Sequence, residues 1–400
     1  MKSAVTKEII TEPLTASIAR KYPTLGGDPE FFIATKRGKT LSACQFLPSK
    51  NNKAPVFIDS SNNGPLCGEY FFDGVQGEIN ILPGTCREGL AARIWRVMNR
   101  VKTEIGSNHK LVMKPSVLVS RDILDNADPE ARRFGCSPDY NAYTGLQNES
   151  RLDGDKHRVR YGGGHIHIGF NKEDRMYDAP EVFLGLVKLL DLLVAIPMLL
   201  LDVGPASNRR RKYYGKAGTF RETVWGVEYR QPSNVWLRSP ELASLAWGLA
   251  RTAYRIVVAN TEDAFWNVVK PEEVQKAIDT SNLDRCIEIY NKIRDLAISA
   301  SHPDDPFCGK LNRTYMMDDR AYYQFFINGA EIYEYVLAKT VDTVYGEDCE
   351  KSWEIRPGGT STRYIGVPPR ITEGFIDGTL NIIKTLDKDN YKRLIRKVLK

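Results

Sequence analysis

The sequence predicts an α+β fold in which helices cover a sheet. From Glu30 to about Pro83, short apolar runs alternate with turn residues such as SNNGP and DG, a pattern typical of strands. Helical spacing of apolar residues runs through most of 241–300 and again through 320–345. Strands and helices do not alternate regularly, so a doubly wound fold is disfavoured.

The first elements follow from local patterns. Strands are expected at 30–34 (EFFIA), 40–47 (TLSACQFL), 78–82 (EINIL) and 113–120 (MKPSVLVS). A helix is expected before the last of these, because apolar residues there are spaced three or four apart. These residues are Leu90, Ile94, Val97, Val101 and Ile105.

The later elements are predicted in the same way. Residues 126–155 are predicted as a long loop, 162–170 (GGGHIHIGF) as a strand, 179–201 as a helix and 223–230 (TVWGVEYR) as a strand. Ser239, Pro240 and Glu241 give the start of a further helix, because a hydroxyl cap, a proline and an acid favour a helix N-terminus.

The 400 residues allow two or three domains of roughly 150 residues, or one large domain with additions. We divide the chain into an N-terminal arm (1–24), a sheet region (25–240) and a mainly helical part (241–400) that completes the same unit. An apolar run at 182–203 is interrupted by Lys188, Asp191 and Pro197, so we expect a buried helix and no membrane span.

Composition excludes several classes of protein. The net charge of +6 is too small to demand a nucleic-acid partner. Residues 1–13 contain no apolar segment, so a signal peptide is not expected. No two of the seven cysteines form a CxxC pair, so a disulfide framework or structural zinc site is not expected, and a reducing cytoplasm fits best.

Polar residues two apart inside apolar strands suggest a functional face. Residues i and i+2 of a strand point to one side, so each pair lies on a single face of the sheet. The pairs are Asp28/Glu30, Gln76/Glu78/Asn80, His165/His167 and Glu228/Arg230. Carboxylates with one or two imidazoles and no nearby thiolate favour Mg²⁺ or Mn²⁺, and zinc is the less favoured alternative because only five histidines are present.

A basic segment predicts a phosphate site. Residues 209–221 contain Arg209, Arg210, Arg211, Lys216 and Arg221, and Arg230 follows soon after. The planar guanidinium group fits phosphate oxygens, although a solvated basic loop would show the same composition. The GGG at 162–164 is not a P-loop and more plausibly allows close backbone approach.

These blocks resemble the glutamine synthetase-like superfamily. GDPEFF (27–32) resembles its "ExEFF" strand, GVQGEIN (74–80) its "GQxEI" strand, GGGHIHIGF its "GxGxHxH" strand and VEYRQPS (227–233) its "ExR" strand. With FGCSPDYNAYTG (134–145) and YGKAGTFR (214–221), the sequence resembles the phage-type COOH–NH2 ligase (amidoligase) family over about residues 22–240.

The resemblance implies a largely antiparallel, curved sheet with one polar concave face and helices packed on the other. It also implies an ATP-dependent ligase with Mg²⁺ or Mn²⁺, in which a carboxylate attacks the γ-phosphate of ATP. The resulting acyl phosphate then meets an amine, giving an amide, ADP and phosphate. Substrates would be small-molecule or peptide carboxylates and amines, and the enzyme would work in the cytoplasm, or in the host cytoplasm if phage-encoded.

The resemblance also implies roles for individual residues. Asp28, His165 and Glu228 would hold the ion that serves the ATP phosphates, and Glu30 and Glu78 would hold the ion nearer the acceptor carboxylate. In the family, the third carboxylate of this second ion lies eight residues before the position of Glu78, but here that residue is Tyr70. Asp73 or Glu69 would therefore take its place, with Asp73 favoured. His167, Arg230 and Arg221 would act on the transferring phosphoryl group. Nucleotide contacts would come from Arg209, Arg211, Lys216, Arg230 and His167.

Other interpretations stay open at this point. A metal-dependent hydrolase or a guanidino-type phosphotransferase could share the carboxylates and arginines. A non-enzymatic virion or nucleic-acid-binding protein is disfavoured, because the ionisable groups lie inside apolar strands and do not form a broad basic stripe. The segment before Asp28 is too short for the extra N-terminal domain of glutamine synthetase, so its ring oligomer and ammonia as the amine are not expected. The oligomeric state is left open.

Overall fold

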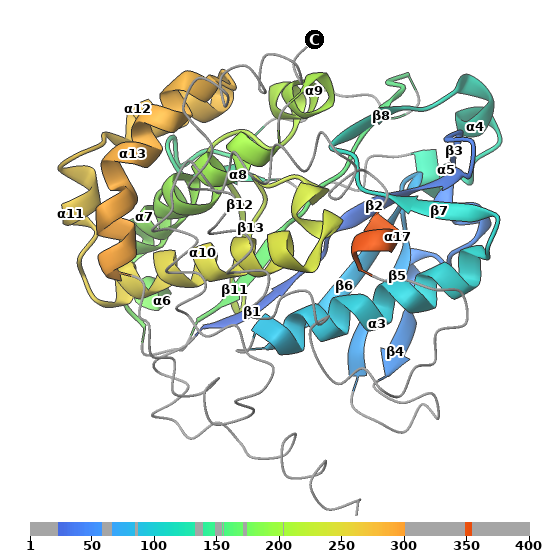
Figure 1. Ribbon diagram of the computed structural model, residues 1–400, viewed down its shortest axis with the longest axis horizontal. Coiled ribbons are helices and arrows are strands. Elements are labelled where there is room, and N and C mark those ends of the chain that lie inside the picture. Colours follow the sequence, from blue (N-terminus) through green and yellow to red (C-terminus); the bar gives the residue numbers. More distant parts are fainter. Residues whose placement is uncertain are drawn as a thin grey trace, which may run out of the picture.

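The computed structural model describes residues 23–57, 66–84, 87–132, 139–148, 154, 156–170, 174–202, 204–300 and 349–353 (Figure 1). The predicted N-terminal arm lies almost wholly outside these residues. The helical pattern predicted at 320–345 also lies outside them. The predicted division of the chain into three parts stays a prediction.

Most of the described strands form one open, 11-stranded sheet, as the α+β prediction requires. Its strand order is β3-β2-β6-β1-β11-β13-β12-β9, with β7 beside β2, β5 beside β6 and β4 beside β5, and the paired strands are antiparallel. The strands of this sheet are β1 (Thr24–Gly27), β2 (Glu30–Thr35), β3 (Thr40–Leu41), β4 (Ala54–Phe57), β5 (Leu66–Asp73), β6 (Gln76–Gly84), β7 (His109–Val112), β9 (Tyr140–Asn141), β11 (Ile166–Gly169), β12 (Thr219–Thr223) and β13 (Gly226–Tyr229). A separate pair is formed by β8 (Ser116–Leu118) and β10 (Val159–Tyr161).

The strands β1 and β2 pair one after the other along the same edge of β6. Gly27 lies opposite Ile81, and Glu30 lies opposite Glu78. Between them, Asp28 and Pro29 break the strand, and the Pro29 carbonyl accepts a hydrogen bond from the Ile79 amide at 3.2 Å. The break therefore leaves Asp28 between β6 and β11 in the middle of the sheet.

Two strand predictions need correction. Residues 40–47 keep strand structure only at Thr40–Leu41 and then form the 3₁₀ turn η1 (Ala43–Gln45), where the Ala43 amide bonds to the Val75 carbonyl. Residues 223–230 are not one strand, because Val224 and Trp225 turn the chain from β12 into β13. Gly226 makes this turn possible, since its φ of 147° is a conformation that L side chains rarely adopt.

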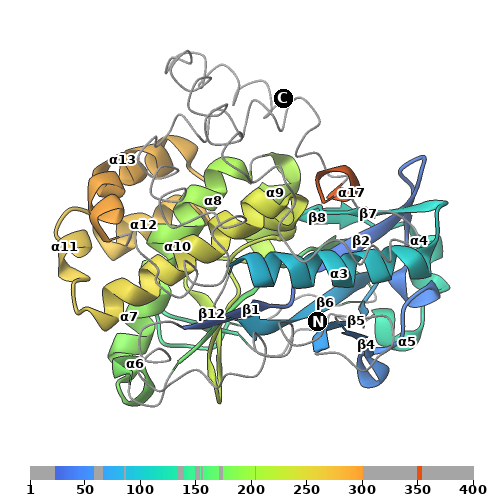
Figure 2. The same ribbon diagram turned by 60° about the horizontal axis from the view of Figure 1, so that its bottom comes forward.

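Helices cover the apolar face of the sheet (Figures 1 and 2). The predicted first helix is α3, and all five apolar residues that predicted it are buried. It packs on β5 and β6, while α10 contacts β11 and lies beside α3 and α7. The helices are α3 (Arg87–Ile105), α4 (Arg121–Asp125), α5 (Pro129–Arg132), α6 (Arg175–Asp178), α7 (Pro180–Leu190), the π turn η3 (Asp191–Ala195), α8 (Ile196–Leu201), α9 (Pro205–Tyr213), α10 (Pro240–Val258), α11 (Asp263–Trp266), α12 (Pro271–Asp279), α13 (Leu283–Ala300) and α17 (Cys349–Ser352), with 3₁₀ turns η2 (Lys50–Asn52) and η4 (Asn234–Arg238).

The apolar run at 180–201 is a core element. Within the described residues, it alone is long and apolar enough to cross a membrane, but 83% of its most apolar window is buried against the rest of the protein. Its π turn places Asp191 behind the sheet, where the carboxyl accepts hydrogen bonds from the Tyr229 hydroxyl (2.7 Å) and the Gly218 amide (2.6 Å). This buried helix is consistent with a soluble protein. The start of α10 also agrees with prediction, because the Ser239 hydroxyl accepts from the Leu242 amide.

Candidate active site

The strand registers place a row of polar groups across the face that the helices leave uncovered. Glu228 on β13 lies opposite Arg221 on β12 and opposite His167 on β11, and His167 lies opposite Gly26 on β1. Directly opposed residues of antiparallel strands point to the same face. Further along, Glu30 on β2 opposes Glu78 on β6. The i, i+2 pattern of the sequence therefore corresponds to one shared face.

A first cluster combines two carboxylates and an imidazole. One ligand atom from each of Asp28, His165 and Glu228 lies within 4.8 Å of the others. His165 Nδ1 is 3.0 Å from Asp28 Oδ1 and 3.4 Å from Glu228 Oε1. His167 Nε2 also reaches Asp28 Oδ1, at 3.1 Å. These are the three residues that the family resemblance implied as ligands of one ion.

A second cluster contains the three carboxylates of Glu30, Asp73 and Glu78, again within 4.8 Å of one another. It includes Asp73 and not Glu69, whose carboxylate is 3.9 Å from Lys53 Nζ. Tyr70 opposes Ile79, so it lies on the buried, helix-covered face of β5. The structure therefore assembles the trio that the sequence favoured.

The second cluster is electrostatically strained when it holds no cation. Burial, together with the charges of Asp28, Asp73 and Glu30, raises the pKa of Glu78 well above its usual range. Burial also raises the pKa of Glu30. In the first cluster, burial opposes ionisation of Asp28, but the charges of His167 and His165 hold the pKa of this carboxyl well below its ordinary value. In the first cluster, neighbouring histidines thus offset the negative charge of the carboxylates, whereas the second cluster has an excess of negative charge.

Glycines bring the backbone close to both clusters. The Gly163 amide donates to Glu30 Oε2 at 2.5 Å, and the Glu30 amide donates to the Gly163 carbonyl at 2.9 Å. A Cβ at Gly163 would lie 2.5 Å from His165 Nε2, and one at Gly164 would lie 2.2 Å from the Ser233 carbonyl oxygen. The GGG segment therefore permits the close approach that its composition predicted.

Arg230 and Arg221 meet Glu228 from different sides. Arg230 pairs with Glu228 through Nη1, donates from Nη2 to the Tyr214 hydroxyl at 2.6 Å, and has Nε 2.6 Å from Asp139 Oδ1. Arg221 Nη1 is 3.2 Å from Glu228 Oε2, and the Arg221 side chain is 31% exposed. Two guanidinium groups thus adjoin the first cluster, one buried and one at the solvent boundary.

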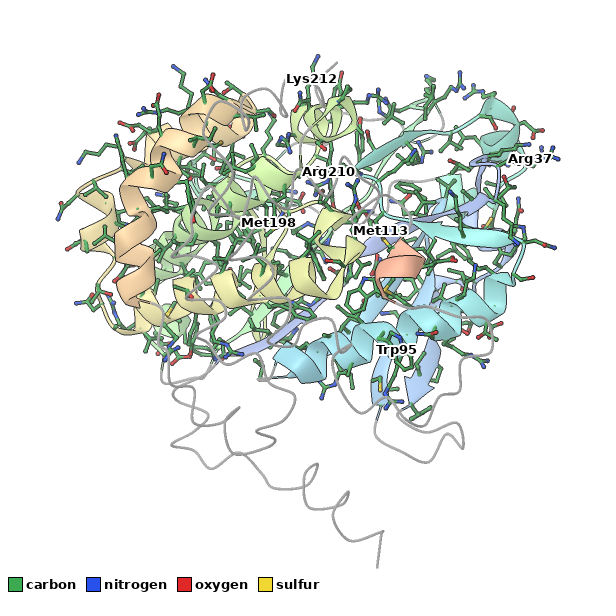
Figure 3. The ribbon with its side chains drawn as sticks, viewed as in Figure 1. Arg37, Trp95, Met113, Met198, Arg210 and Lys212 are labelled. Atoms are coloured by element: carbon green, nitrogen blue, oxygen red, sulfur yellow. The ribbon has the colours of Figure 1, made fainter. Side chains whose placement is uncertain are left out.

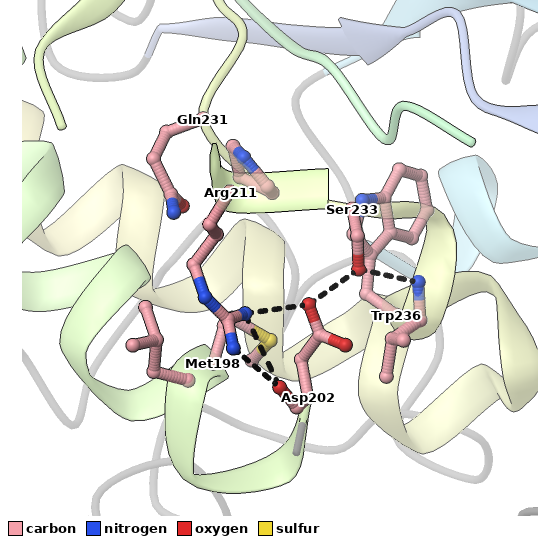
Figure 4. A pocket seen from close by; sticks show the side chains of 9 residues that line it. Met198, Asp202, Arg211, Gln231, Ser233 and Trp236 are labelled. Carbon is pink, nitrogen blue, oxygen red and sulfur yellow. Dashed lines mark hydrogen bonds and ion pairs between the residues drawn. The ribbon is translucent and has the colours of Figure 1, made fainter. Parts of the chain in front are cut away.

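The other predicted cationic residues lie apart from the clusters. Arg211 is buried and donates to Asp202 (Figure 4). It also donates to Asn208 and Ser281, so its donors serve the packing of α9. The cavity at this ion pair has a volume of about 10 Å³, room for about one water molecule. Arg209 and Lys216 are exposed.

Arg210 and Lys212, two residues apart on α9, point in opposite directions. Arg210 turns inward and donates to the carbonyls of Gln231 and Pro232, whereas Lys212 points out to solvent (Figure 3). The structure therefore brings Arg221, Arg230 and His167 to the clusters, but not Arg209, Arg211 or Lys216.

An open pocket of about 600 Å³ extends from the clusters along the polar face. Its lining includes Asp28, Glu78 and Glu228 from the clusters, and Thr24, Gly169 and Trp225. Trp225 is 40% exposed, and its ring lies 5.1 Å from that of His167. The volume falls within the range that holds a nucleotide-sized ligand.

Three residues at the site had no role in the sequence analysis. Asp139 and Tyr214 lie in blocks that were compared with the family, but only folding shows that both contact Arg230. Tyr214 also places its hydroxyl 3.1 Å from His165 Nε2. Lys50, on η2, has Nζ 3.0 Å from Asp73 Oδ2, and no local sequence pattern marks it.

One known family matches part of the chain. Residues 148–304 match the family described as phage phiEco32-like COOH-NH2 ligase, type 2, which indicates a carboxylate–amine ligase. This segment includes His165, His167, Arg221, Glu228 and Arg230, whereas Asp28 and the three-carboxylate cluster lie before it. No curated protein matches the chain. The match over residues 148–304 confirms the resemblance to the phage-type COOH–NH2 ligase (amidoligase) family that the sequence motifs predicted.

Proposed function

We propose that this protein is an ATP-dependent ligase that joins a carboxylate to an amine through an acyl phosphate, releasing ADP and phosphate. The observation that carries the proposal is the pair of ligand clusters, Asp28/His165/Glu228 and Glu30/Asp73/Glu78, because each of them contributes to the lining of one open pocket, the first through Asp28 and Glu228 and the second through Glu78. The substrates would be small-molecule or peptide carboxylates and amines, and the working compartment would be the cytoplasm.

The donor chemistry of the clusters fits divalent cations. Three carboxylates in one cluster, and two carboxylates with one imidazole in the other, are ligands that suit Mg²⁺ or Mn²⁺. Asp28, His165 and Glu228 would hold one ion, and Glu30, Asp73 and Glu78 a second. Such ions neutralise charge on phosphate oxygens and orient them.

The cationic side chains would act on the phosphoryl group. In phosphoryl transfer, charge is spread over three equatorial oxygens, and catalysis consists mainly of positioning and charge stabilisation. Arg230 is held by Glu228, Asp139 and Tyr214, so its guanidinium has little freedom to reorient. Such a preorganised donor stabilises developing charge without reorganisation during the reaction. Arg221 and His167 line the same pocket and would contribute further positive charge.

Substrate carboxylate activation requires no protein nucleophile. Attack of the substrate carboxylate oxygen on the γ-phosphorus breaks the bond to the β–γ bridging oxygen and releases ADP. Attack of the amine nitrogen on the acyl carbon then forms the amide, expels phosphate and releases a proton. The positive charges of Arg230 and Arg221 near the phosphoryl oxygens would stabilise the negative charge that develops in both steps.

A hydroxylamine trapping experiment tests the proposal. With ATP, Mg²⁺, an accepted carboxylic acid and hydroxylamine, the enzyme should form a hydroxamate in proportion to the ADP released. A screen of ADP release across a grid of acids and amines would first identify the accepted acid. An acid that stimulates ATP turnover without yielding hydroxamate would contradict the acyl phosphate.

The same experiment separates the other candidate functions. AMP and pyrophosphate would indicate adenylation, and a phosphorylated guanidine would indicate a guanidino-type phosphotransferase. Substrate cleavage without nucleotide would indicate a metal-dependent hydrolase.

A further inference from the structure

Lys50 lies at the edge of the three-carboxylate cluster but belongs to no motif of the sequence. It sits on the 3₁₀ turn η2, 23 residues before Asp73, and its Nζ is 3.0 Å from Asp73 Oδ2. Its side chain is 45% exposed, whereas that of Asp73 is 15% exposed. The ammonium group can therefore leave Asp73 without crossing packed protein.

The positive charge of Lys50 partly offsets the negative charge of the three-carboxylate cluster. Glu30, Asp73 and Glu78 bring three carboxyl groups together, and the Lys50 charge acts on Glu78 and Asp28 as well as on Asp73. The first cluster differs, because Glu228 is already paired with Arg221 and Arg230. Within the described residues, Lys50 is the cation seen in an ion pair with the three-carboxylate cluster.

A divalent ion held by these carboxylates would change the surroundings of Lys50. The ion would take over the Asp73 oxygens and repel the nearby ammonium group. Lysine has a flexible four-carbon stem, and Lys50 lines the same pocket as Arg221, which enters from β12. A phosphate chain in that pocket would offer the ammonium group a new partner.

We propose that Lys50 is a further nucleotide-binding residue, which pairs with Asp73 while the three-carboxylate cluster holds no divalent ion and moves to a phosphate oxygen when the ion and nucleotide bind. The inference rests on the proposed function. It predicts that removal of the Lys50 charge has opposite effects on two ligands. The protein should bind a divalent ion alone more tightly, because the Lys50 ammonium group no longer competes for Asp73. It should bind the nucleotide more weakly, because a phosphate oxygen loses the same ammonium group as a partner.

The test uses the full chain with Lys50→Met, Lys50→Arg and Lys36→Met. Lys36→Met is the matched control, because it removes the same charge from the exposed β2–β3 turn, next to Arg37 (Figure 3), and Lys36 is not among the residues that line the pocket. Binding of Mn²⁺ alone is measured by electron paramagnetic resonance. Binding of the β,γ-imido analogue of ATP with Mg²⁺ is measured by calorimetry.

Lys50→Met should bind Mn²⁺ roughly tenfold more tightly than the unsubstituted protein and the nucleotide analogue roughly tenfold more weakly. Lys50→Arg and Lys36→Met should change neither affinity more than about twofold. Parallel loss of both affinities in Lys50→Met would indicate a merely structural role, and unchanged analogue binding would also overturn the inference. If the unsubstituted protein does not bind the Mg²⁺–nucleotide analogue at all, the proposed function fails and the inference fails with it.

Discussion

His167 and Glu228 lie directly opposite each other on β11 and β13, so an imidazole and a carboxylate share one face of the sheet beside the pocket. Two hydrogen-bonded strands fix this relationship, and no loop is involved. Sites held on regular elements are positioned more rigidly than sites held on loops. The predictions below use this rigidity, because substitutions on the polar face should alter chemistry without rearranging the sheet.

Glu228→Gln should lower turnover by roughly a hundredfold or more, because it removes one carboxylate from the first cluster and the partner of both arginines. The measurement is steady-state ADP release with an accepted acid under saturating Mg²⁺. Glu222→Gln is the matched control, since Glu222 lies on the same hairpin but is exposed and opposes Val227. Full activity in Glu228→Gln would remove this residue from the proposed site.

Glu78→Gln should raise the melting temperature of the metal-free protein at pH 8 and abolish activity. Burial and neighbouring carboxylates raise the pKa of Glu78 in the folded state, so ionised Glu78 destabilises the fold. A raised folded-state pKa means that stability falls as the pH rises from the unfolded-state pKa towards the folded-state value. The advantage of the variant should therefore shrink as the pH is lowered through the raised folded-state pKa towards the ordinary pKa of a glutamate, because the folded Glu78 becomes protonated over that range.

The measurement for this variant is thermal unfolding in excess chelator between pH 5 and pH 8. Glu69→Gln serves as the control, because Glu69 lies on the polar face of β5 but is half-buried and near Lys53. An equal gain from both substitutions would mean that general negative charge, and not the three-carboxylate cluster, sets the effect.

Arg230→Lys should reduce turnover more than it reduces the affinity for ATP. Lysine cannot reproduce the three directions in which Arg230 contacts Glu228, Asp139 and Tyr214. The loss of charged hydrogen bonds is worth about 1.5–3 kcal/mol, or roughly 10–100-fold in rate. Steady-state kinetics with varied ATP separates the two quantities, and unchanged turnover with weakened ATP binding would instead assign Arg230 to ground-state binding.

Tyr214→Phe should lower turnover by about fivefold, because the hydroxyl that bridges Arg230 and His165 is worth about 1 kcal/mol as a hydrogen bond. Tyr213→Phe is the matched control on the preceding residue, whose side chain is 47% exposed. Stopped-flow measurement of ADP release gives both rates. Equal effects in the two variants would show that Tyr214 acts only through packing.

The polar pairs were predictable because strand geometry alone puts residues i and i+2 on one face. That rule, with the family resemblance, predicted Asp28, His165 and Glu228 as one group and Glu30 and Glu78 as another. The register of the β5–β6 hairpin sets Phe71 opposite Glu78, so Asp73 and Glu69 lie two residues to either side on the same face. The choice between them needed the folded side chains, because Asp73 lies within 4.8 Å of Glu30 and Glu78 whereas Glu69 lies near Lys53. The sequence supplies no local signal for that side-chain placement.

Other features depend on long-range packing and could not be predicted. Arg211 lies in a basic segment that is typical of a phosphate site, but α9 turns its side chain towards Asp202, where a buried ion pair uses its donors. Lys50 reaches Asp73 because the chain just before it is held to the end of β5, where the Phe72 amide donates to the Pro48 carbonyl at 2.9 Å. The 223–230 segment appeared as one strand because Val224 and Trp225 are good strand residues, although Gly226 permits a turn there.

The break between β1 and β2 sets the distance between the two ligand clusters. Asp28 contributes to one cluster and Glu30 to the other, so the separation of the two groups of ligands is set by a single Asp-Pro-Glu tripeptide of fixed covalent length. Pro29 stiffens that tripeptide, because its ring locks one backbone torsion. A ligand that spans both clusters must therefore fit a separation that the two peptide bonds of this tripeptide limit. Movement of the surrounding helices should change that separation little.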